Sequence, residues 1–325
     1  MFSITGYKQF QRCELQWYFK NIVADARVKN DPYRKEITIL SKLDSVEAWR
    51  GKIVDDVISR LLVNAINQKY PVNKEYFLNE ANQQFDKQLE YAAFQKYREP
   101  DRRYTQDKDF AALTGFEFGE SISDESLAQA KLDINDAINN LLDDKEFIEY
   151  LKSAKWLVSQ RTLKYHLDRF AIVAVPDLIM FFEDQPPHIV DWKVHTYGLN
   201  TYDEQLIFYA MALYKVVQEK PHVDFPANVK EYKLFDYKLT EYQLLHQDHT
   251  KREYEITTDK LEQLSDKMSK GILEMYMKGC HHKYVDSDKE SFETTHFIEN
   301  CENCSFQKIC KPSDHELLRN RYFQN

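Results

Sequence analysis

The amino-acid sequence predicts an α/β fold, and two observations lead to this prediction. In the first half of the chain, apolar residues recur mostly at helical intervals. Near Ala154 the pattern changes to short runs with the composition and spacing of strands. Helix, strands, helix and strand then follow one another, an order typical of an α/β core with helical additions.

Four helices are expected in the first half of the chain. Residues 5–21, 45–67 and 124–152 place apolar side chains at helical spacing, and residues 74–97 are polar but helical in composition. Residues 100–120 are charged and irregular, which predicts a loop or a lid. The first half is therefore predicted to be mainly helical.

Four short strands and two helices are expected in the second half. The strands are predicted at residues 155–165, 169–182, 188–194 and 229–237. The helices are predicted at residues 202–220 and 257–278, and the second of them is amphipathic. Four of the five cysteines follow this last helix.

The overall composition is that of a globular protein, with 43% hydrophobic and 30% charged residues. The net charge of −9 argues against broad binding to duplex nucleic acid, which needs clustered Lys and Arg, but a narrow basic groove is compatible with it. No apolar stretch follows a basic N-terminus, and the longest apolar run, residues 170–182, is shorter than the ~20 residues of a membrane-crossing helix. We therefore expect a cytoplasmic protein without a membrane segment.

Two aspartates and a lysine form the candidate reaction centre. Residues two apart in a strand share a face, so Asp191 and Lys193 are expected to point the same way. Pairing of the neighbouring strands across the polar turn at residues 183–187 would bring Asp177 near Asp191. Buried charges of this kind are costly unless they are neutralised, and a divalent cation does so. The alternative is a surface salt bridge between Asp191 and Lys193, with Asp177 as a turn residue.

These side chains suit the hydrolysis of a phosphodiester. Carboxylate oxygens are ligands for Mg²⁺ or Mn²⁺, and such an ion lowers the pKa of bound water and stabilises charge on the phosphate. A lysine orients the attacking water or stabilises the negative charge that develops. The residue types alone are therefore compatible with a metal-dependent phosphodiester hydrolase, and the surface salt bridge stays open as the alternative.

The order of these residues resembles a known motif. Pro176-Asp177 followed by Asp191-Trp192-Lys193 resembles the motif for which the PD-(D/E)XK nuclease superfamily is named. Gln205-Leu-Ile-Phe-Tyr209 resembles the Q-x-x-x-Y helix of its RecB-type branch. The resemblance implies a restriction-endonuclease-like core, a central mixed sheet flanked by helices, in which Gln205 and Tyr209 share one helix face and reach the catalytic site. The competing interpretation makes Tyr209 a core residue and leaves Gln205 facing solvent.

The chain departs from the RecB-type pattern at one metal ligand. Those nucleases usually carry a histidine four residues after a glycine on an upstream helix, and Asp55 occupies this position after Gly51. Aspartate is a competent ligand for Mg²⁺ or Mn²⁺, so Asp55 is the predicted third metal ligand beside Asp177 and Asp191. Asp56 leaves this assignment open by one residue.

The cysteines form a second candidate site. Cys301, Cys304 and Cys310 lie close together in sequence, and Cys13 completes a set of four if the chain ends meet. This split layout resembles the iron–sulfur members of the RecB-type branch, such as AddB-type nuclease domains and CRISPR-associated adaptation exonucleases. The resemblance implies a structural four-iron, four-sulfur (4Fe-4S) cluster. Zn²⁺ at the four cysteines and free thiols are the alternatives. The Cys280-His281-His282 run is interpreted as incidental.

The resemblance also implies the division and activity of the chain. Residues 1–153 are predicted to be a mainly helical region, residues 154–278 the nuclease core, and residues 279–325 a cysteine-rich tail packing on the N-terminus. The implied function is a metal-dependent DNA exonuclease acting on single strands or ends, with possible protein partners in a repair, CRISPR, phage or defence complex. The alternative is a non-catalytic or attenuated nucleic-acid-binding or assembly subunit that retains the nuclease fold. Aromatic residues of the first helix, Phe10, Trp17 and Tyr18, are candidates for base stacking or for the core.

Overall fold

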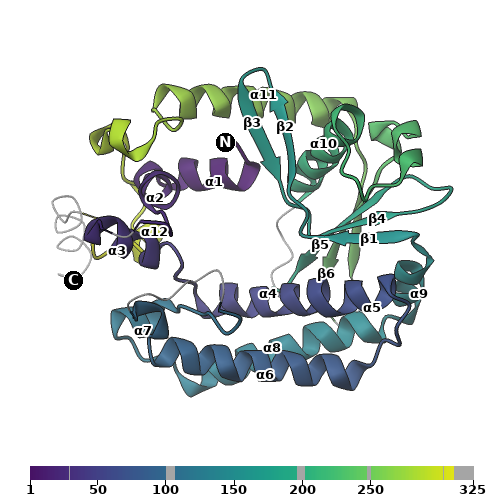
Figure 1. The fold of residues 1–325 in the computed structure, drawn as a ribbon, viewed down its shortest axis with the longest axis horizontal. Helices are drawn as coiled ribbons and strands as arrows, with labels where there is room; N and C mark the ends of the chain where they lie inside the picture. The colour runs from purple at the N-terminus through teal and green to yellow at the C-terminus, as the bar shows by residue number, and fades with distance from the viewer. Residues whose placement is uncertain (29, 100–106, 196–201, 247–249, 303, 311–325) are drawn as a thin grey trace. The chain divides into compact units, whose positions relative to one another are not determined.

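The computed structural model describes residues 1–28, 30–99, 107–195, 202–246, 250–302 and 304–310. These residues form two compact units, which we treat separately (Figure 1). The sheet unit comprises residues 1–4, 46–87 and 123–272, and the cysteine unit comprises residues 5–45, 88–122 and 273–325. Within the described residues, no helix has the length and apolar character needed to cross a membrane.

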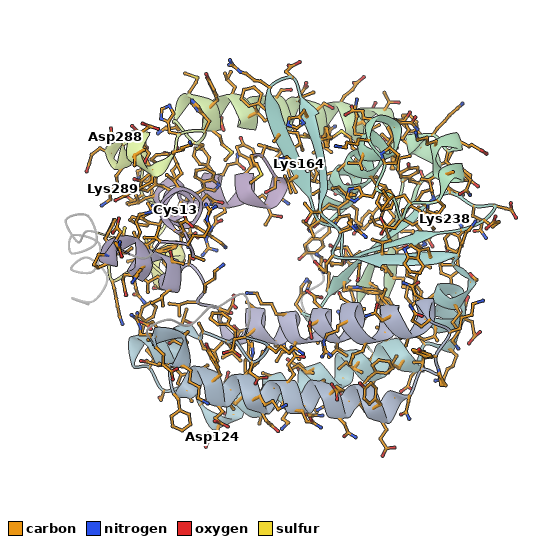
Figure 2. The ribbon with its side chains drawn as sticks, in the orientation of Figure 1. Cys13, Asp124, Lys164, Lys238, Asp288 and Lys289 are labelled. Carbon is orange, nitrogen blue, oxygen red and sulfur yellow. The ribbon has the colours of Figure 1, made fainter. Side chains whose placement is uncertain are left out.

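A five-stranded mixed sheet forms the centre of the sheet unit. Its order is β1-β4-β5-β6-β7, with β5 and β6 parallel and the other neighbours antiparallel. The strands are β1 (Trp156–Ser159), β4 (Leu178–Phe181), β5 (His188–Lys193), β6 (Lys238–Gln243) and β7 (Lys251–Tyr254). Lys238 marks the start of β6 in Figure 2. The mixed sheet flanked by helices confirms the predicted α/β, restriction-endonuclease-like core.

A separate hairpin lies between β1 and β4 along the chain. It consists of β2 (Leu163–Leu167) and β3 (Phe170–Ala174), and its side chains alternate between buried and exposed along β2. Lys164 occupies one of the exposed positions (Figure 2). The buried face packs against α10 (Asp203–Glu219). The chain therefore leaves the sheet after β1, forms the hairpin, and returns to the sheet at β4, directly after Asp177.

Helices cover the sheet and carry further side chains of the unit. They are α4 (Val46–Val57), α5 (Val63–Asn67), α6 (Lys74–Ala93, of which residues 74–87 belong to this unit), α8 (Asp124–Asp143), α9 (Lys145–Ser153), α10 and α11 (Thr258–Met277, of which residues 258–272 belong to it). A π-helical turn, Ile58–Leu62, joins α4 to α5. Trp49 of α4 stacks on Phe85 of α6, with ring centroids 4.6 Å apart. This packing holds α4, the helix of Asp55, against its neighbours.

The two faces of β5 and β6 differ in chemistry because side chains alternate along a strand. On one face, the register partners Trp192 and Tyr242 both contact the ring of Phe147 from α9, with centroids 6.0 and 5.1 Å away. His188 begins β5 on this apolar face, where its ring contacts the hydroxyls of Tyr150 at 3.0 Å and Thr240 at 2.7 Å. The opposite face carries Asp191. One face thus anchors the strands and the other holds the polar side chains.

The cysteine unit is built from short helices. They are α1 (Ile4–Arg12), α2 (Glu14–Tyr18), α3 (Pro32–Leu40), α7 (Thr114–Phe118), α12 (Glu299–Glu302) and a π-helical turn, Phe19–Val23. Short 3₁₀ turns lie at Lys96–Arg98, Tyr284–Asp286 and Lys289–Ser291. The backbone N–H of Leu15 donates to the carbonyl of Glu293 at 3.0 Å, and the rings of Tyr18 and Phe292 lie 4.7 Å apart. Residues early and late in the chain therefore pack together in this unit.

The structure corrects several predicted elements. The predicted strand at 229–237 is wrong: 3₁₀ turns occupy Ala227–Glu231 and Leu234–Asp236, and the strand begins at Lys238. The predicted strand at 155–165 is broken at Gln160, whose φ of +49° ends β1. The predicted run 169–182 is broken before β4, where Pro176 lacks the N–H that a central strand donates.

Two predicted segments of the first half also change. The helix at 5–21 is interrupted at Cys13, whose extended backbone and sulfur cap α2 by accepting the Gln16 N–H. Within the predicted loop at 100–120, α7 is helical at Thr114–Phe118, whereas residues 100–106 lie outside the described residues. The three predicted region boundaries remain predictions.

Candidate active site and cysteine pocket

A row of charged side chains crosses four strands of the sheet on one face. Asp191 and Glu241 are register partners on β5 and β6, and Arg252 of β7 is the partner of Glu241. On the other side, the register of β4 with β5 places Asp177 opposite Asp191, one step beyond the last paired residues. The row therefore reads Asp177, Asp191, Glu241 and Arg252.

Asp177 is held by donors on both of its carboxylate oxygens. The backbone N–H of Trp192 donates to Oδ2 at 3.0 Å, and Nε2 of Gln160 donates to Oδ1 at 3.1 Å. The backbone N–H of Gln160 also donates to the carbonyl of Asp177 at 3.1 Å. The left-handed backbone of Gln160 thus directs both of its donors to Asp177. Gln160 had no sequence signal, because its role depends on this backbone turn.

Asp191 and Lys193 form an ion pair on the same face of β5. Their side chains are 1% and 13% exposed, so the pair is buried and is not the surface salt bridge of the alternative interpretation. Nε2 of Gln205 lies 3.4 Å from Oδ1 of Asp191 and donates to the Tyr209 hydroxyl at 2.6 Å. Gln205 and Tyr209 of α10 therefore both face the site, and Gln205 does not point only to solvent.

Lys193 also has an aromatic neighbour. Its Nζ lies 4.1 Å from the centre of the Tyr202 ring, a cation–π distance. The end of β5 beyond it is fixed by Arg50 of α4, which donates to the carbonyl of Val194 at 2.7 Å and pairs with Asp133 of α8. These contacts hold the ammonium of Lys193 at the site. Neither Tyr202 nor Arg50 had a sequence signal.

Asp55 of α4 interacts electrostatically with Asp191 and Lys193 of the same site. Burial and the negative charge of Asp191 together raise the pKa of Asp55 to about 6, against the opposing effect of Lys193. Asp56, the neighbouring candidate, is 42% exposed and pairs with Arg60 at 3.1 Å. The structure therefore places Asp55, and not Asp56, with the other two aspartates.

Burial also shifts the pKa values of Asp177 and Asp191. Burial raises the pKa of Asp177 well above its usual value, and the charges of Asp191 and Asp55 add to this effect. Burial also raises the pKa of Asp191, against the lowering by Lys193. Three mutually repelling carboxylates, one buried and two partly buried, are stabilised in their ionised form by a nearby positive charge. Their oxygens are the donor type that Mg²⁺ and Mn²⁺ prefer, so the residues fit such an ion.

Within the described part of the chain, no group of three or more His, Cys, Asp and Glu side chains is arranged to hold a metal ion as it stands. At the aspartates, the ammonium of Lys193 supplies the nearest positive charge in the structure. Ion binding would therefore require these side chains to move.

Four cysteines line one pocket of the cysteine unit. Cys13, Cys301, Cys304 and Cys310 all contribute to its wall, together with Gln16, Phe19 and Phe306 among others. Cys13 lies at the break between α1 and α2 (Figure 2). All four are free thiols. Gln16 donates through its backbone N–H to the sulfur of Cys13 and through Nε2 to the sulfur of Cys304, each at 3.4 Å.

The thiols influence one another electrostatically. Burial raises the pKa of Cys301 and of Cys310 to about 11 each, and the neighbouring cysteines add to both shifts. Burial likewise raises the pKa of Cys304. Four cysteine sulfurs around one pocket are the donor set of an iron–sulfur cluster or of Zn²⁺.

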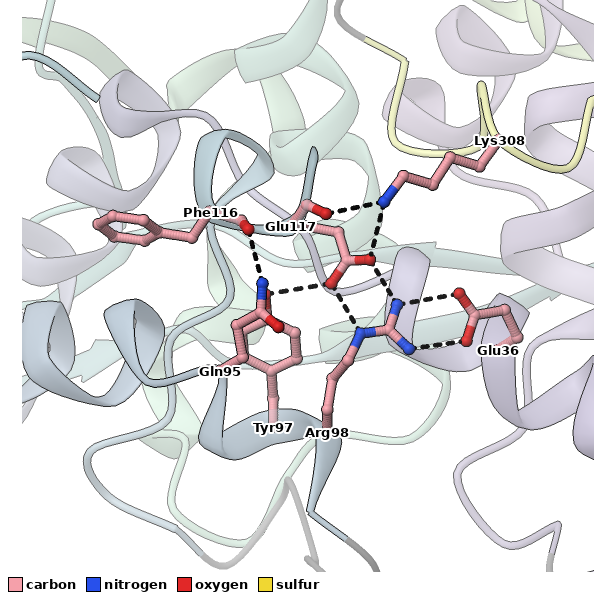
Figure 3. A network of polar contacts seen from close by, with 7 residues as sticks. All are labelled: Glu36, Gln95, Tyr97, Arg98, Phe116, Glu117 and Lys308. Carbon is pink, nitrogen blue, oxygen red and sulfur yellow. Dashed lines mark hydrogen bonds and ion pairs between the residues drawn. The ribbon is translucent and has the colours of Figure 1, made fainter. Parts of the chain in front are cut away.

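A polar network around the buried Glu117 anchors the segment between the last two cysteines (Figure 3). Nζ of Lys308 donates to the backbone carbonyl of Glu117 at 2.7 Å. The Glu117 carboxylate, which is 3% exposed, accepts from Arg98 and from the Tyr97 hydroxyl. Arg98 also pairs with Glu36 of α3 through two contacts at 2.8 and 2.9 Å. The cysteine segment is thereby tied to α3 and α7.

The aromatic residues of the first helices are core residues. Phe10, Trp17 and Tyr18 are 3–4% exposed, and their rings contact one another or Phe292. Their possible use in base stacking is therefore wrong. Near Cys280, His281 stacks on Tyr276 and makes an edge contact with His282, with ring centroids 4.2 Å apart in each pair.

Comparison with known proteins agrees with this geometry. A mixed sheet that carries an aspartate pair and a lysine on one face is the framework of a nuclease core. The family model described as PD-(D/E)XK nuclease superfamily matches residues 1–311, and the chain belongs to this superfamily. Its members are typically nucleases that use divalent metals such as Mg²⁺. No curated protein matches the sequence.

The pKa of Asp55 predicts how metal binding depends on pH. Because Mn²⁺ must displace the protons that the raised pKa values of Asp55 and Asp177 favour, the dissociation constant should fall by about tenfold per pH unit or more below about pH 6 and continue to fall above it. Asp55→Asn should weaken binding and flatten this dependence. Calorimetric titration with Mn²⁺ between pH 5 and 8 measures both effects. Asp56→Asn is the matched control, and equal effects of the two variants would contradict the assignment of Asp55.

Proposed function

We propose that this chain is a Mg²⁺- or Mn²⁺-dependent DNA nuclease that acts as an exonuclease on single strands or DNA ends. The observation that carries the proposal is the set of three aspartates, the buried Asp191 and the partly buried Asp55 and Asp177, whose pKa values are raised by desolvation and, for Asp55 and Asp177, by the neighbouring carboxylates. The adjacent Lys193 and the superfamily match support it. Structural aspartates with no cation to bind would be expensive in this position.

Each residue of the proposed centre has a separate task. Asp55, Asp177 and Asp191 would hold the cation, which supplies an activated water and stabilises charge on the phosphate. Lys193 orients the attacking water and donates to the oxygen on which negative charge develops. Gln205 and Tyr209 position the Asp191 carboxylate, and Gln160 positions that of Asp177.

The proposal assigns a structural 4Fe-4S cluster to Cys13, Cys301, Cys304 and Cys310. Their convergence on one pocket supports a four-thiolate site. The backbone and side-chain donors of Gln16 already point to two of the sulfurs, as hydrogen bonds to cluster ligands do. Zn²⁺ is the rival for the same ligands, and metal analysis of the purified protein separates the two.

The test is cleavage of labelled DNA by the metal-replete protein. We expect a linear single strand to be degraded with Mn²⁺ or Mg²⁺, no cleavage with EDTA, and resistance of a circular single strand. Asp191→Ala and Lys193→Ala should both be inactive. The matched controls are Asp144→Ala and Lys251→Ala, since Asp144 and Lys251 form another partly buried ion pair in the same unit, 2.6 Å apart.

Three outcomes would change the proposal. Equal activity of Asp191→Ala, Lys193→Ala and the wild type would refute the assigned centre. Cleavage of the circular strand would replace exonuclease by endonuclease action. Binding to DNA without any cleavage would favour a non-catalytic binding subunit, an alternative consistent with aspartate at the usual histidine position.

A further inference from the structure

Gln243 is a buried amide whose two ends have different surroundings. It ends β6 and is 0% exposed. Its Nε2 donates to the carboxylate of Glu241. Its Oε1 is buried and accepts no hydrogen bond from any residue in the described part of the chain. A buried amide oxygen without a donor destabilises the folded state, so its presence calls for an explanation.

Glu241 fixes the orientation of this amide. Its carboxylate is 0% exposed, accepts from the Tyr254 hydroxyl at 2.6 Å and lies 3.6 Å from the guanidinium of Arg252. Turning the Gln243 amide over would place its oxygen against this carboxylate, which is repulsive. The amide oxygen therefore cannot gain a partner by exchanging places with the nitrogen.

Lys193 is the cation closest to Gln243 in the strand register. The two residues are direct partners of the parallel β5–β6 pair, and the N–H of Leu244 donates to the Lys193 carbonyl at 2.9 Å. Register partners on neighbouring strands share a face at about 4.8 Å, which is within reach of a lysine side chain. In the structure, however, the ammonium of Lys193 pairs with Asp191.

We infer that the Gln243 oxygen accepts the Lys193 ammonium when a divalent cation binds Asp191, which makes Gln243 a positioning residue for Lys193. The inference rests on the cation site of the proposed function. The ammonium and the cation compete for the same carboxylate, so cation binding pushes Lys193 away. The Gln243 oxygen on the neighbouring strand β6 then accepts the ammonium, which offsets the lost ion pair and keeps Lys193 beside the reaction centre.

The test is a double-mutant cycle that measures Mn²⁺ binding by calorimetry without nucleic acid. Gln243→Met keeps the length of the side chain and removes the acceptor. It should raise the dissociation constant for Mn²⁺ about tenfold in the presence of Lys193. In the Lys193→Ala background, where no ammonium needs an acceptor, the same change should alter it by less than about twofold.

Controls separate this role from simple packing. Thr240→Val alters a buried polar residue of the same strand, 3% exposed and bonded to His188 on the other face, and should leave Mn²⁺ binding unchanged. Equal weakening by Gln243→Met in both backgrounds, or a wild type that binds no Mn²⁺, would overturn the inference. Coupling without any DNA cleavage would instead keep the inference and refute the nuclease.

The wild type provides a readout that does not depend on folding of the variant. The side-chain amide signal of Gln243 in a ¹⁵N spectrum should shift when diamagnetic Mg²⁺ is added, because its carbonyl gains a donor. A signal that stays in place at saturating Mg²⁺ would contradict the inference.

Discussion

An Asp177→Asn protein is expected to lose metal-dependent cleavage and yet to unfold at a higher temperature than the wild type. Asparagine retains an oxygen that accepts from Trp192 or Gln160 but has no charge for the cation. We expect kcat to fall by about a thousandfold or more, the scale for removal of a group that stabilises transition-state charge.

The gain in stability follows from the sign of the pKa shift. The folded-state pKa of Asp177 is raised, so above its unfolded value of 3.8 the folded protein resists the ionisation that the unfolded chain undergoes. This cost grows as the pH rises toward the folded pKa. A neutral asparagine removes it, together with repulsion from Asp191 and Asp55. The gain should therefore be larger at pH 8 than at pH 4.

Thermal unfolding in EDTA at these two pH values measures this effect. About 1 kcal/mol corresponds to roughly 2–4 °C in a domain of this size, so an increase of several degrees at pH 8 is expected. Asp144→Asn is the control, because Asp144 has its pKa lowered by Lys251 and Tyr242 despite burial, and its neutralisation should destabilise the protein. A lower Tm for Asp177→Asn with EDTA would show that Asp177 is a structural residue.

The sequence predicted the parts of the site that regular periodicity exposes. Strand alternation placed Asp191 and Lys193 on one face, and helical spacing placed Gln205 and Tyr209 together. In both cases the neighbours in space are two or four residues apart in sequence. The predicted pairing of the two strands across the turn at residues 183–187 is also confirmed, because a short turn leaves two adjacent strands few alternatives.

The same periodicity concealed β6. Its inward positions include Glu241 and Gln243, polar residues at 0% exposure, so the alternation of apolar residues that marks a half-buried strand is absent. The aromatic residues just before it resemble a strand in sequence but form 3₁₀ turns, and in the second turn the Asp236 carboxylate accepts from the backbone N–H of Lys233. Buried polar side chains on a strand thus remove the apolar alternation from which the strand would be predicted.

Replacing Cys304 by alanine is expected to remove the bound cluster and to destabilise the cysteine unit. Cys304 lies in the pocket wall with the other three cysteines and accepts from Gln16. Loss of one ligand forfeits much of the metal-binding free energy, which is folding free energy for a site absent from the unfolded chain. With about 4 kcal/mol lost, Tm should fall by roughly 10 °C or more.

Iron, sulfide and zinc analysis and the visible absorption of wild type and variant measure the first effect. We expect a brown wild type with iron and a colourless Cys304→Ala. Cys280→Ala is the matched control, because Cys280 is a partly buried thiol in the same unit that does not line the pocket, and this variant should keep its iron. A colourless wild type with one Zn²⁺ would replace the cluster by a zinc site. Equal Tm and metal content in wild type and Cys304→Ala would exclude any metal at these cysteines, and Lys308 with its partners around Glu117 would then be what holds the segment in place.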